Sequence, residues 1–261
     1  MNVGLIGAGH IARALAEGWS RPRVTGAPAL VFFDIDAAKA RELAAATGGR
    51  AAASAAELVA EAELVIVAVR PEYVEGVLRE IGAGLGGRPL VSVAAGVTLE
   101  RLKAALPEGC RVARVMPNVA AALGLGVFLF VPGTLGPRFV EVDDLFALAG
   151  EVVEVDEALF DAATAVAGCM PGIIAYLVEA FAAAGVAHGL AEEVAARLAI
   201  SGVHGAAAIV ARERDPSAVV AAAATPGGMT AAAVETLAER ELAQTVDLAV
   251  AAAIARAKEL A

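Results

Sequence analysis

The first half of the chain alternates short apolar runs with segments of helical length, and this alternation restricts the fold more than any other feature. The runs are rich in Val, Ile, Leu and Phe and too short for helices. Each intervening segment is long enough to cross over and return to a parallel strand. The pattern predicts a parallel sheet of the α/β class. We predict strands at 3–6, 30–33, 64–68, 90–93, 112–115, 126–131 and 151–155, and helices at 11–19, 37–47, 55–61, 71–81, 99–106 and 139–148.

After about residue 158 the strand-like runs stop, and long segments rich in Ala, Leu, Val and Glu follow. They are interrupted near 168–172, 185–189, 215–216 and 226–228, which predicts a separate all-α domain. Its helices are apolar on more than one face, and a lone bundle would expose those faces to water. We therefore expect domains at 1–156 and 157–261, and a homodimer formed through the C-terminal helices, with a higher oligomer left open.

The charge balance excludes a sequence-independent nucleic-acid partner. The net charge is −10, and no cluster of Lys and Arg could neutralise phosphates. The chain enters its first strand directly, without a charged segment followed by a cleavable apolar one, so we expect a cytoplasmic protein. The uncharged run 162–178 is interrupted by Gly168, Pro171 and Gly172. This run predicts a buried interface helix rather than a membrane span.

Neither cysteine nor histidine suggests a metal site. Cys110 and Cys169 are far apart and lack zinc-ligand spacing, so we expect no disulfide and no metal. Cys169 has no nearby His or Lys to activate it, and we interpret it as a small buried side chain rather than a reactive thiol. His188 and His204 have no ligand-like neighbours. For His10 a contact to a phosphate and simple exposure stay equally open.

Gly7-x-Gly9-x-x-Ala12 follows the first predicted strand and opens the first predicted helix. Gly7 permits a sharp turn, Gly9 a close backbone approach to a pyrophosphate, and Ala12 close packing of helix on strand. The helix N-terminus then meets the phosphate charge. The motif predicts a dinucleotide site of the Rossmann type, the alternative being a glycine turn without a ligand.

Asp34 ends the second predicted strand, where a carboxylate can accept hydrogen bonds from ribose hydroxyls. A carboxylate repels a 2′-phosphate, and neither Ile35 nor Asp36 supplies an Arg to neutralise one. We therefore expect NADH as the preferred cofactor, with NADPH as the alternative. Asp34 could instead cap the helix that begins near residue 37.

Five further motifs occur in order along nearly the whole chain, and with the glycine loop they resemble the pyrroline-5-carboxylate reductase family. That family makes L-proline by hydride transfer to a cyclic imine. The resemblance implies a Rossmann-type doubly wound sheet followed by an all-α dimerisation domain. It also implies cofactor contacts at Gly7, Gly9, His10, Ile11, Asp34, Ala68, Val69, Arg70, Ala94, Ala95, Met116 and Asn118. The motifs are Ala68-Val69-Arg70-Pro71, Val93 to Thr98, Arg114 to Asn118, Ala184 to Leu190 and Thr225 to Thr230.

The turn Thr225-Pro226-Gly227-Gly228-Met229-Thr230 would bind the substrate by this resemblance. Its glycines open a helix, whose free backbone N–H groups can hold a carboxylate. The Thr230 hydroxyl would help to place a proton as the imine becomes an amine, which makes it the catalytic candidate. The substrate-binding residues would be Thr225, Gly227, Gly228, Met229 and Thr230. The alternative is an ordinary helix start.

The sequence of this chain differs from the family's usual motif at the start of a helix that, by the resemblance, lies beside the substrate. It has Ala167-Gly168-Cys169-Met170-Pro171 where the family usually has Ser-Gly-Ser-Gly-Pro. Two hydroxyls are lost, and Met170 adds a flexible bulky side chain. Two alternatives to the family reaction therefore stay open: a reductase of a different cyclic imine, and a homologue that binds the dinucleotide without turnover.

Overall fold

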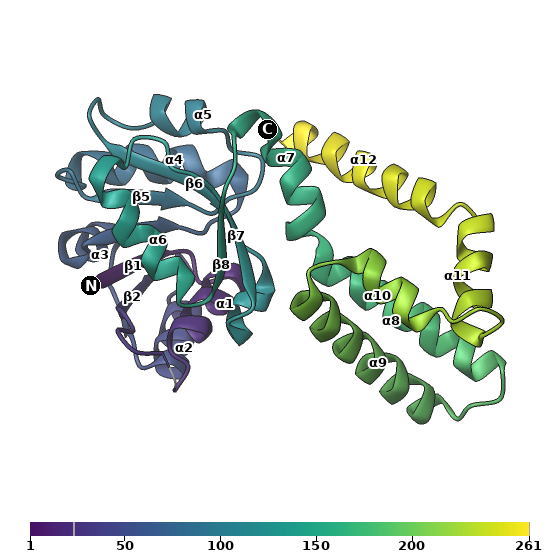
Figure 1. The fold of residues 1–261 in the computed structure, drawn as a ribbon. Coiled ribbons are helices and arrows are strands. Elements are labelled where there is room, and N and C mark those ends of the chain that lie inside the picture. The colour runs from purple at the N-terminus through teal and green to yellow at the C-terminus, as the bar shows by residue number, and fades with distance from the viewer. Residues whose placement is uncertain (23, 261) are drawn as a thin grey trace. The chain divides into compact units, whose positions relative to one another are not determined.

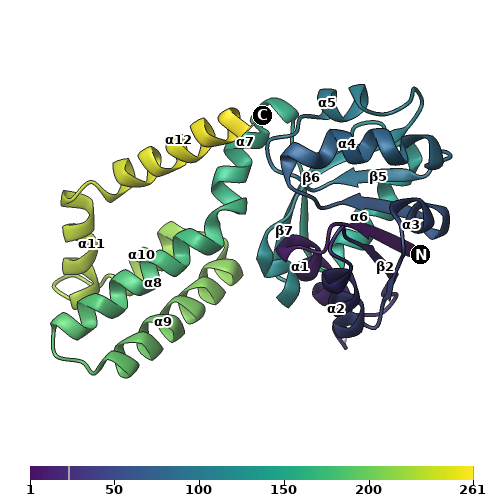
Figure 2. The same cartoon turned by 180° about the vertical axis from the view of Figure 1, so that it is seen from behind.

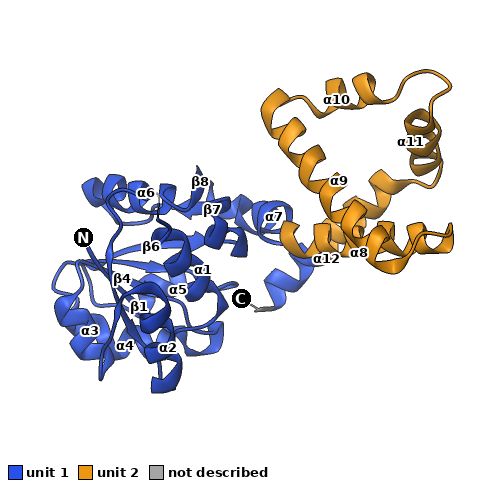
Figure 3. Ribbon diagram, turned by 90° about the horizontal axis from the view of Figure 1, so that it is seen from below, with its two compact units in different colours: residues 1–169, 253–261 blue, residues 170–252 orange. Residues whose placement is uncertain are grey.

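The computed structural model describes residues 1–22 and 24–260. They form two compact units (Figure 3). The sheet unit contains Met1–Cys169 and Ala253–Ala261, and the helical unit contains Met170–Ala252.

The described part of the sheet unit contains an eight-stranded sheet in the order β3-β2-β1-β4-β5-β6-β7-β8 (Figure 1). Neighbouring strands are parallel except for β6 and β7. The predicted doubly wound α/β fold is confirmed, and each predicted strand is present. The two-residue β3 was not predicted. The strands are β1 Asn2–Ile6, β2 Ala29–Phe33, β3 Arg50–Ala51, β4 Leu64–Val67, β5 Pro89–Ser92, β6 Arg111–Met116, β7 Gly126–Val131 and β8 Gly150–Glu154.

The antiparallel pairing of β6 with β7 follows from the connection between them. This connection holds only a 3₁₀ helix, η2 (Val119–Leu123), which ends at Gly124 with φ 72°. A parallel partner would need a crossover of a dozen or more residues. The chain therefore turns back along β6, and α6 (Phe139–Ala147) then restores the parallel order between β7 and β8.

Helices cover both faces of the sheet, and each face has its own apolar core (Figures 1 and 2). One core joins α1 and α2 to α6 and contains Trp19, Phe32 and Phe146. The other joins α3, α4 and α5 and contains Leu58 and Leu78. The remaining helices of these cores are α1 His10–Trp19, α2 Ala37–Thr47, α3 Ala55–Glu61, α4 Pro71–Ile81 and α5 Leu99–Ala104.

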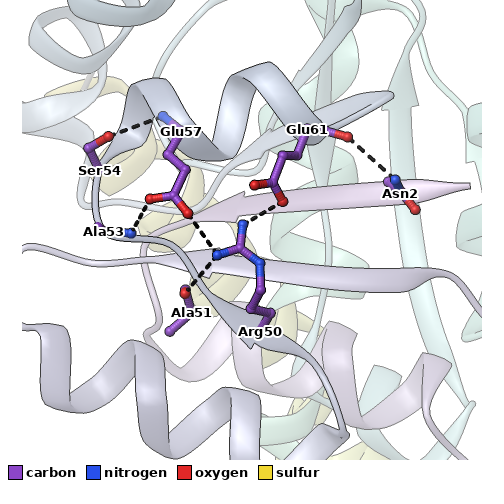
Figure 4. A network of polar contacts seen from close by, with 7 residues as sticks. All are labelled: Asn2, Arg50, Ala51, Ala53, Ser54, Glu57 and Glu61. Atoms are coloured by element: carbon purple, nitrogen blue, oxygen red, sulfur yellow. Dashed lines mark hydrogen bonds and ion pairs between the residues drawn. The ribbon is translucent and has the colours of Figure 1, made fainter.

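The start of α3 is fixed by a polar network on the surface (Figure 4). Ser54 Oγ accepts from the Glu57 N–H at 3.1 Å, and Glu57 Oε2 accepts from the Ala53 N–H at 2.8 Å. This is close to the reciprocal capping box of Ser and Glu three residues apart. Arg50 on β3 bonds both Glu57 and Glu61. The Ala53 N–H and then Arg50 lower the pKa of the Glu57 carboxyl below its usual range.

The second half is helical, as predicted. A π-helical turn, η5 (Thr164–Gly168), follows α7 (Phe160–Ala163) and precedes α8. The predicted breaks separate α8, α9, α10 and α11. A further break, at Arg240 and Glu241, was not predicted; Glu241 has a φ of 55°. The helices are α8 Met170–Ala187, α9 Glu192–Glu213, α10 Pro216–Ala223, α11 Met229–Glu239 and α12 Leu242–Leu260.

The helical unit buries almost none of its apolar side chains in a single chain. Within 170–252, Ala195 alone of the described residues is buried. Two described segments, Glu157–Ala187 and Glu192–Glu213, are long and apolar enough by length and composition to cross a membrane. In the apolar 18-residue stretch of each, 6% of the residues are buried. Side chains of α8 and α9 surround an apolar groove of about 460 Å³ that includes Phe181, Gly185 and Leu198.

Candidate functional site

The glycine loop lies where the chain leaves β1. Gly7 has a φ of +98°, and its N–H bonds the carbonyl of Phe33 at 2.8 Å. A Cβ at Gly7 would lie 2.6 Å from the carbonyl oxygen of Ala68. A side chain at this position would therefore meet both backbone strain and a clash. The residue type is required by the turn itself.

Gly9 is the N-cap of α1, and no described side chain caps this helix. A Cβ built at Gly9 meets no described atom within 4 Å. The space in front of the helix N-terminus is therefore open, and the first N–H groups of α1 face it. Such an end binds phosphate. The residues present fit a pyrophosphate, with His10 exposed and Ile11 half-buried in the first turn.

Asp34 connects the glycine loop to the turn that follows β2. Its Oδ2 accepts from the Ala8 N–H and its Oδ1 from the Asp36 N–H, both at 2.8 Å. Each carboxylate oxygen has a second lone pair, so a ribose hydroxyl can still bind. The interpretation of Asp34 as the cap of α2 is wrong. Asp36 is the N-cap, and its Oδ1 accepts from the Ala38 N–H at 3.1 Å.

A cavity of about 560 Å³ opens beside this turn, between β1, β2 and β4. The strand order reverses between β1 and β4, the place where open α/β sheets bind ligands. Six of the predicted cofactor residues line it: Gly7, Gly9, Asp34, Ala68, Val69 and Arg70. The volume lies within the usual range for small-molecule sites.

Several lining residues were not predicted from the sequence. Ile35 is 95% exposed at the cavity, and Lys39 lies in the first turn of α2. On the opposite wall, α4 presents residues with a helical spacing of three, four and seven. This periodicity could have identified them: Tyr73, Gly76, Val77 and Glu80. Arg70 donates to the Tyr73 hydroxyl at 2.9 Å, and its guanidinium lies over the Tyr73 ring.

The other predicted cofactor residues, His10, Ile11, Ala94, Ala95, Met116 and Asn118, are not part of this lining among the described residues. Ala94 and Ala95 follow β5, and Met116 ends β6. Ser92 pairs in parallel with Arg114, so both loops leave the same edge of the sheet. The carboxyl ends of β1 and β4 lie at that edge too. These residues extend the site along the edge.

Asn118 is 6% exposed and already makes several hydrogen bonds. Its Oδ1 accepts from the N–H groups of Ala120 and Val127 at 3.2 and 3.4 Å, and its Nδ2 donates to the Ala167 carbonyl at 3.2 Å. The side chain therefore fixes the turn after β6 and holds the segment that carries the altered residues Cys169 and Met170. Its contact to a cofactor stays a prediction.

Gly168 is the last residue of η5, and Met170 is the first residue of α8. A Cβ at Gly168 would be 3.7 Å from Met116 Cε, so the turn approaches the β6 loop. Cys169 is exposed in the single chain, which corrects the prediction of a buried side chain. Met170 is 41% exposed. Cys110 is half-buried, and burial raises the pKa of its thiol, so it stays protonated and unreactive.

A buried cation joins β6 to the segment after β8. Arg114 is 4% exposed, its Nη1 lies 3.2 Å from Glu157 Oε1, and its guanidinium packs on the Phe160 ring at 3.9 Å. Glu157 Oε1 also accepts from the Leu99 N–H at 2.6 Å. Burial lowers the pKa of Arg114, and Glu157 opposes that shift. These contacts link the strand that ends at Met116 to the start of α7.

The predicted substrate turn lies in the helical unit, so Thr225 to Thr230 are not part of the cavity lining. Gly227 has a φ of +74°, and the Gly228 N–H bonds the Thr225 carbonyl at 2.9 Å. Gly228 is the N-cap of α11, and no described side chain caps this helix. Thr230 is exposed in its first turn and Met229 is 92% exposed. The turn can therefore offer backbone N–H groups and a hydroxyl to a carboxylate.

No group of three or more His, Cys, Asp or Glu side chains in the described residues could hold a metal ion. The sheet unit contains a cavity beside the glycine loop, which has room for a dinucleotide. The helical unit contains a helix start without a side-chain cap, which can bind an anion.

Two family models match the chain. The model described as pyrroline-5-carboxylate reductase dimerisation matches residues 157–260, and that described as NADP oxidoreductase coenzyme F420-dependent matches residues 2–96. The chain is 37% identical to pyrroline-5-carboxylate reductase of Mycobacterium leprae, over 99% of this chain and 96% of that protein. It is 34% identical to the Arabidopsis thaliana reductase, over 99% and 95%.

Solved structures agree with these matches. A pyrroline-5-carboxylate reductase from Coxiella burnetii aligns with a TM-score of 0.91 and 25% identity, over 100% of this chain and 98% of that one. The Plasmodium falciparum pyrroline carboxylate reductase, solved with NADP bound, aligns with a TM-score of 0.87 and 25% identity over the same shares. The similarity thus spans both the nucleotide cavity and the helical half, and the chain belongs to the pyrroline-5-carboxylate reductase family.

Proposed function

We propose that this protein reduces 1-pyrroline-5-carboxylate to L-proline, as an NAD(P)H-dependent oxidoreductase acting on a carbon–nitrogen double bond. The observation that carries the proposal is similarity along the full length to reductases of this name, together with an intact glycine loop beside a nucleotide-sized cavity. The uncapped start of α11 supports an anionic substrate.

The cofactor roles follow from the same geometry. A bound nicotinamide dinucleotide would supply the hydride. The N–H groups at the start of α1, with Gly9, would hold its pyrophosphate, and Asp34 would bind a ribose hydroxyl. Ala94, Ala95, Met116 and Asn118 would border the nicotinamide end. Much of the rate enhancement would come from holding the imine carbon against the hydride donor.

The substrate roles belong to residues 225–230. The N–H groups after Gly227 and Gly228 would hold the substrate carboxylate, and the Thr230 hydroxyl would bond the ring nitrogen or that carboxylate. A hydroxyl at the ring nitrogen can deliver a proton as the imine becomes an amine. The reaction then needs no metal ion for activation.

We further propose that NADH is preferred over NADPH, because the carboxylate of Asp34 at the end of β2 would repel a 2′-phosphate. We place the domain boundary at 156 and 157, where the match to the dimerisation model begins, although the compact units divide after Cys169. The C-terminal helices would join two chains into a homodimer. Their exposed apolar segments would then face a second copy rather than a membrane. A cytoplasmic location and the absence of a nucleic-acid partner complete the proposal.

A different cyclic imine is the second candidate. It is favoured by Cys169 and the 41% exposed Met170, where the family usually has Ser and Gly. The added side chain would narrow a pocket and make it more apolar. A homologue that binds the dinucleotide without turnover is the third.

Purified protein, NADH or NADPH, and a panel of five- and six-membered cyclic imines with and without the carboxylate would separate the three. We expect the fastest loss of NADH absorbance with 1-pyrroline-5-carboxylate. A faster reaction with another ring would favour the second candidate. Cofactor binding without reduction of any imine, under conditions where a control reductase works, would favour the third.

Thr230→Val keeps the shape of the side chain and removes the hydroxyl. We expect kcat/KM for the carboxylate-bearing imine to fall about tenfold or more, the value of one charge-assisted hydrogen bond. Thr236→Val is the matched control on α11, because its hydroxyl donates to the Ala232 carbonyl of the same helix at 2.9 Å. Equal losses in both variants would contradict the role of Thr230.

A further inference from the structure

The wall of the nucleotide cavity formed by the turn after β2 carries three charged side chains: Asp34, Asp36 and Lys39. This wall would meet the adenosine ribose, where NADH has a hydroxyl and NADPH a phosphate. A 2′-phosphate needs a cation or free N–H groups to compensate its charge. The turn has one candidate of each kind, the Lys39 ammonium and the N-terminus of α2.

Asp36 engages both candidates. Its Oδ1 caps α2 through the Ala38 N–H at 3.1 Å, and its Oδ2 lies 3.9 Å from the Lys39 ammonium nitrogen. The carboxylate therefore lies between the two groups that could receive a phosphate. The two oxygens of Asp34 instead accept from the Ala8 and Asp36 N–H groups.

The other cation of the cavity is held on the opposite wall. Arg70 bonds the Tyr73 hydroxyl at 2.9 Å and lies 3.4 Å from Glu72. Lys39 is therefore the cation that shares a wall with Asp34. Its pair with Asp36 is exposed, with side chains 61% and 50% accessible, and such pairs are weak. A single substitution can release Lys39.

We propose that Asp36 determines the choice between NADH and NADPH by occupying the start of α2 and pairing with Lys39, and that Lys39 is a latent 2′-phosphate ligand. This inference rests on the proposed dinucleotide site and adds two residues that determine its specificity. Asp34 adds a second negative charge to the same wall, holds the glycine loop in place through the Ala8 N–H, and offers its remaining lone pairs to ribose.

The test uses the full chain and follows the binding of NADH and NADPH by nucleotide fluorescence, without an imine. Asp36→Ser keeps a good N-cap oxygen and removes the charge. We expect the ratio of the Kd for NADPH to the Kd for NADH to fall about tenfold, the value of one hydrogen bond to a charged group. Adding Lys39→Met to Asp36→Ser should restore the original ratio.

Asp144→Ser is the matched control, because it removes the same charge from an exposed position on α6 outside the cavity lining. Its ratio should match that of the unmodified chain. The inference is overturned if NADH binds and Asp36→Ser leaves the ratio unchanged, or if the gain persists in the double variant. Failure of the unmodified chain to bind either nucleotide would instead overturn the proposed function, and this inference with it.

Discussion

Trp19 and Phe146 of the sheet unit are fully buried, whereas Phe181 and Leu198 of the helical unit are 61% and 54% exposed. Both units are apolar, but only the sheet unit covers its apolar side chains within one chain. Its two faces are closed by helices packed on a single sheet. The α8–α9 pair instead leaves an open groove. The helical unit therefore has an apolar surface that a single chain does not cover.

The two units also differ in how they are arranged for binding. The nucleotide cavity is formed by loops at the edge of a rigid sheet, and Gly7 and Asp34 are fixed there by hydrogen bonds between distant residues. The predicted substrate turn at 225–230 depends on short-range contacts such as the hydrogen bond from the Gly228 N–H to the Thr225 carbonyl. We therefore expect cofactor binding to tolerate damage to assembly better than imine reduction does.

The strongest test of this comparison places a charge in the groove. We expect Leu198→Lys to weaken homodimer formation by at least a thousandfold, because a lysine ammonium would be buried without a partner. Sedimentation analysis measures the assembly. Val140→Lys is the control, because Val140 is an aliphatic side chain of the sheet unit that is 61% exposed, and the substitution introduces the same charge. Dimers that survive Leu198→Lys would show that the groove is not an interface.

A large substitution in the sheet core tests the other side of the comparison. The Phe146 ring packs edge-on against Trp19, Phe128 and Phe130, with centroids 5.7, 5.1 and 5.6 Å away. We expect Phe146→Ala to lower the free energy of unfolding by about 3–5 kcal/mol. Fluorescence of Trp19, the only tryptophan, follows the sheet unit.

Phe181→Ala provides the contrast to Phe146→Ala. Its effect on stability should depend on protein concentration, because the proposed homodimer would cover this side chain with a second copy. The effect of Phe146→Ala on the sheet unit should not. The same concentration dependence in both variants would break the comparison.

Removing the charge that faces the buried Arg114 should have an intermediate effect on the free energy of unfolding. Glu157→Gln keeps the shape of the side chain that faces Arg114 and removes its charge. We expect a loss of about 1–3 kcal/mol, because Arg114 is left buried with a weaker partner. Urea unfolding followed by Trp19 fluorescence measures it. Glu154→Gln, an exposed carboxylate on β8, is the control, and an equal loss there would mean that Arg114 does not need Glu157.

The smallest effect is expected at the surface network of Figure 4. The Ala53 N–H and Arg50 lower the pKa of Glu57 in the folded chain. Its stabilising contribution is therefore present above the ordinary value of about 4.3 and is lost as the pH falls through the lower folded value. Urea midpoints of the unmodified chain and Glu57→Gln should differ slightly at pH 7 and converge below about pH 4. A gap that stays constant across this range would contradict the assignment.

Much of the fold could be predicted because its signals are local. The apolar runs, the glycine loop and the breaks of the second half depend on residue type and short-range periodicity, and the predicted strands and helices formed at those places. The spacing of Ser54 and Glu57 is another local signal, since these side chains cap the start of α3. The motifs around Met116 and Thr225 indicated the family, which the relatives confirm.

The remaining features depend on residues that meet only after folding. The Arg114–Glu157 pair, 43 residues apart, and the position of Lys39 at the cavity have no short-range signature. The choice of the residue that caps α2 is another case, since Asp34 and Asp36 are two residues apart and their sequence positions suit both as an N-cap. The loop geometry decided it by bringing the Ala8 N–H to Asp34. The sequence by itself thus determined the elements and the family, and the tertiary structure decided which of two similar side chains faces which neighbour.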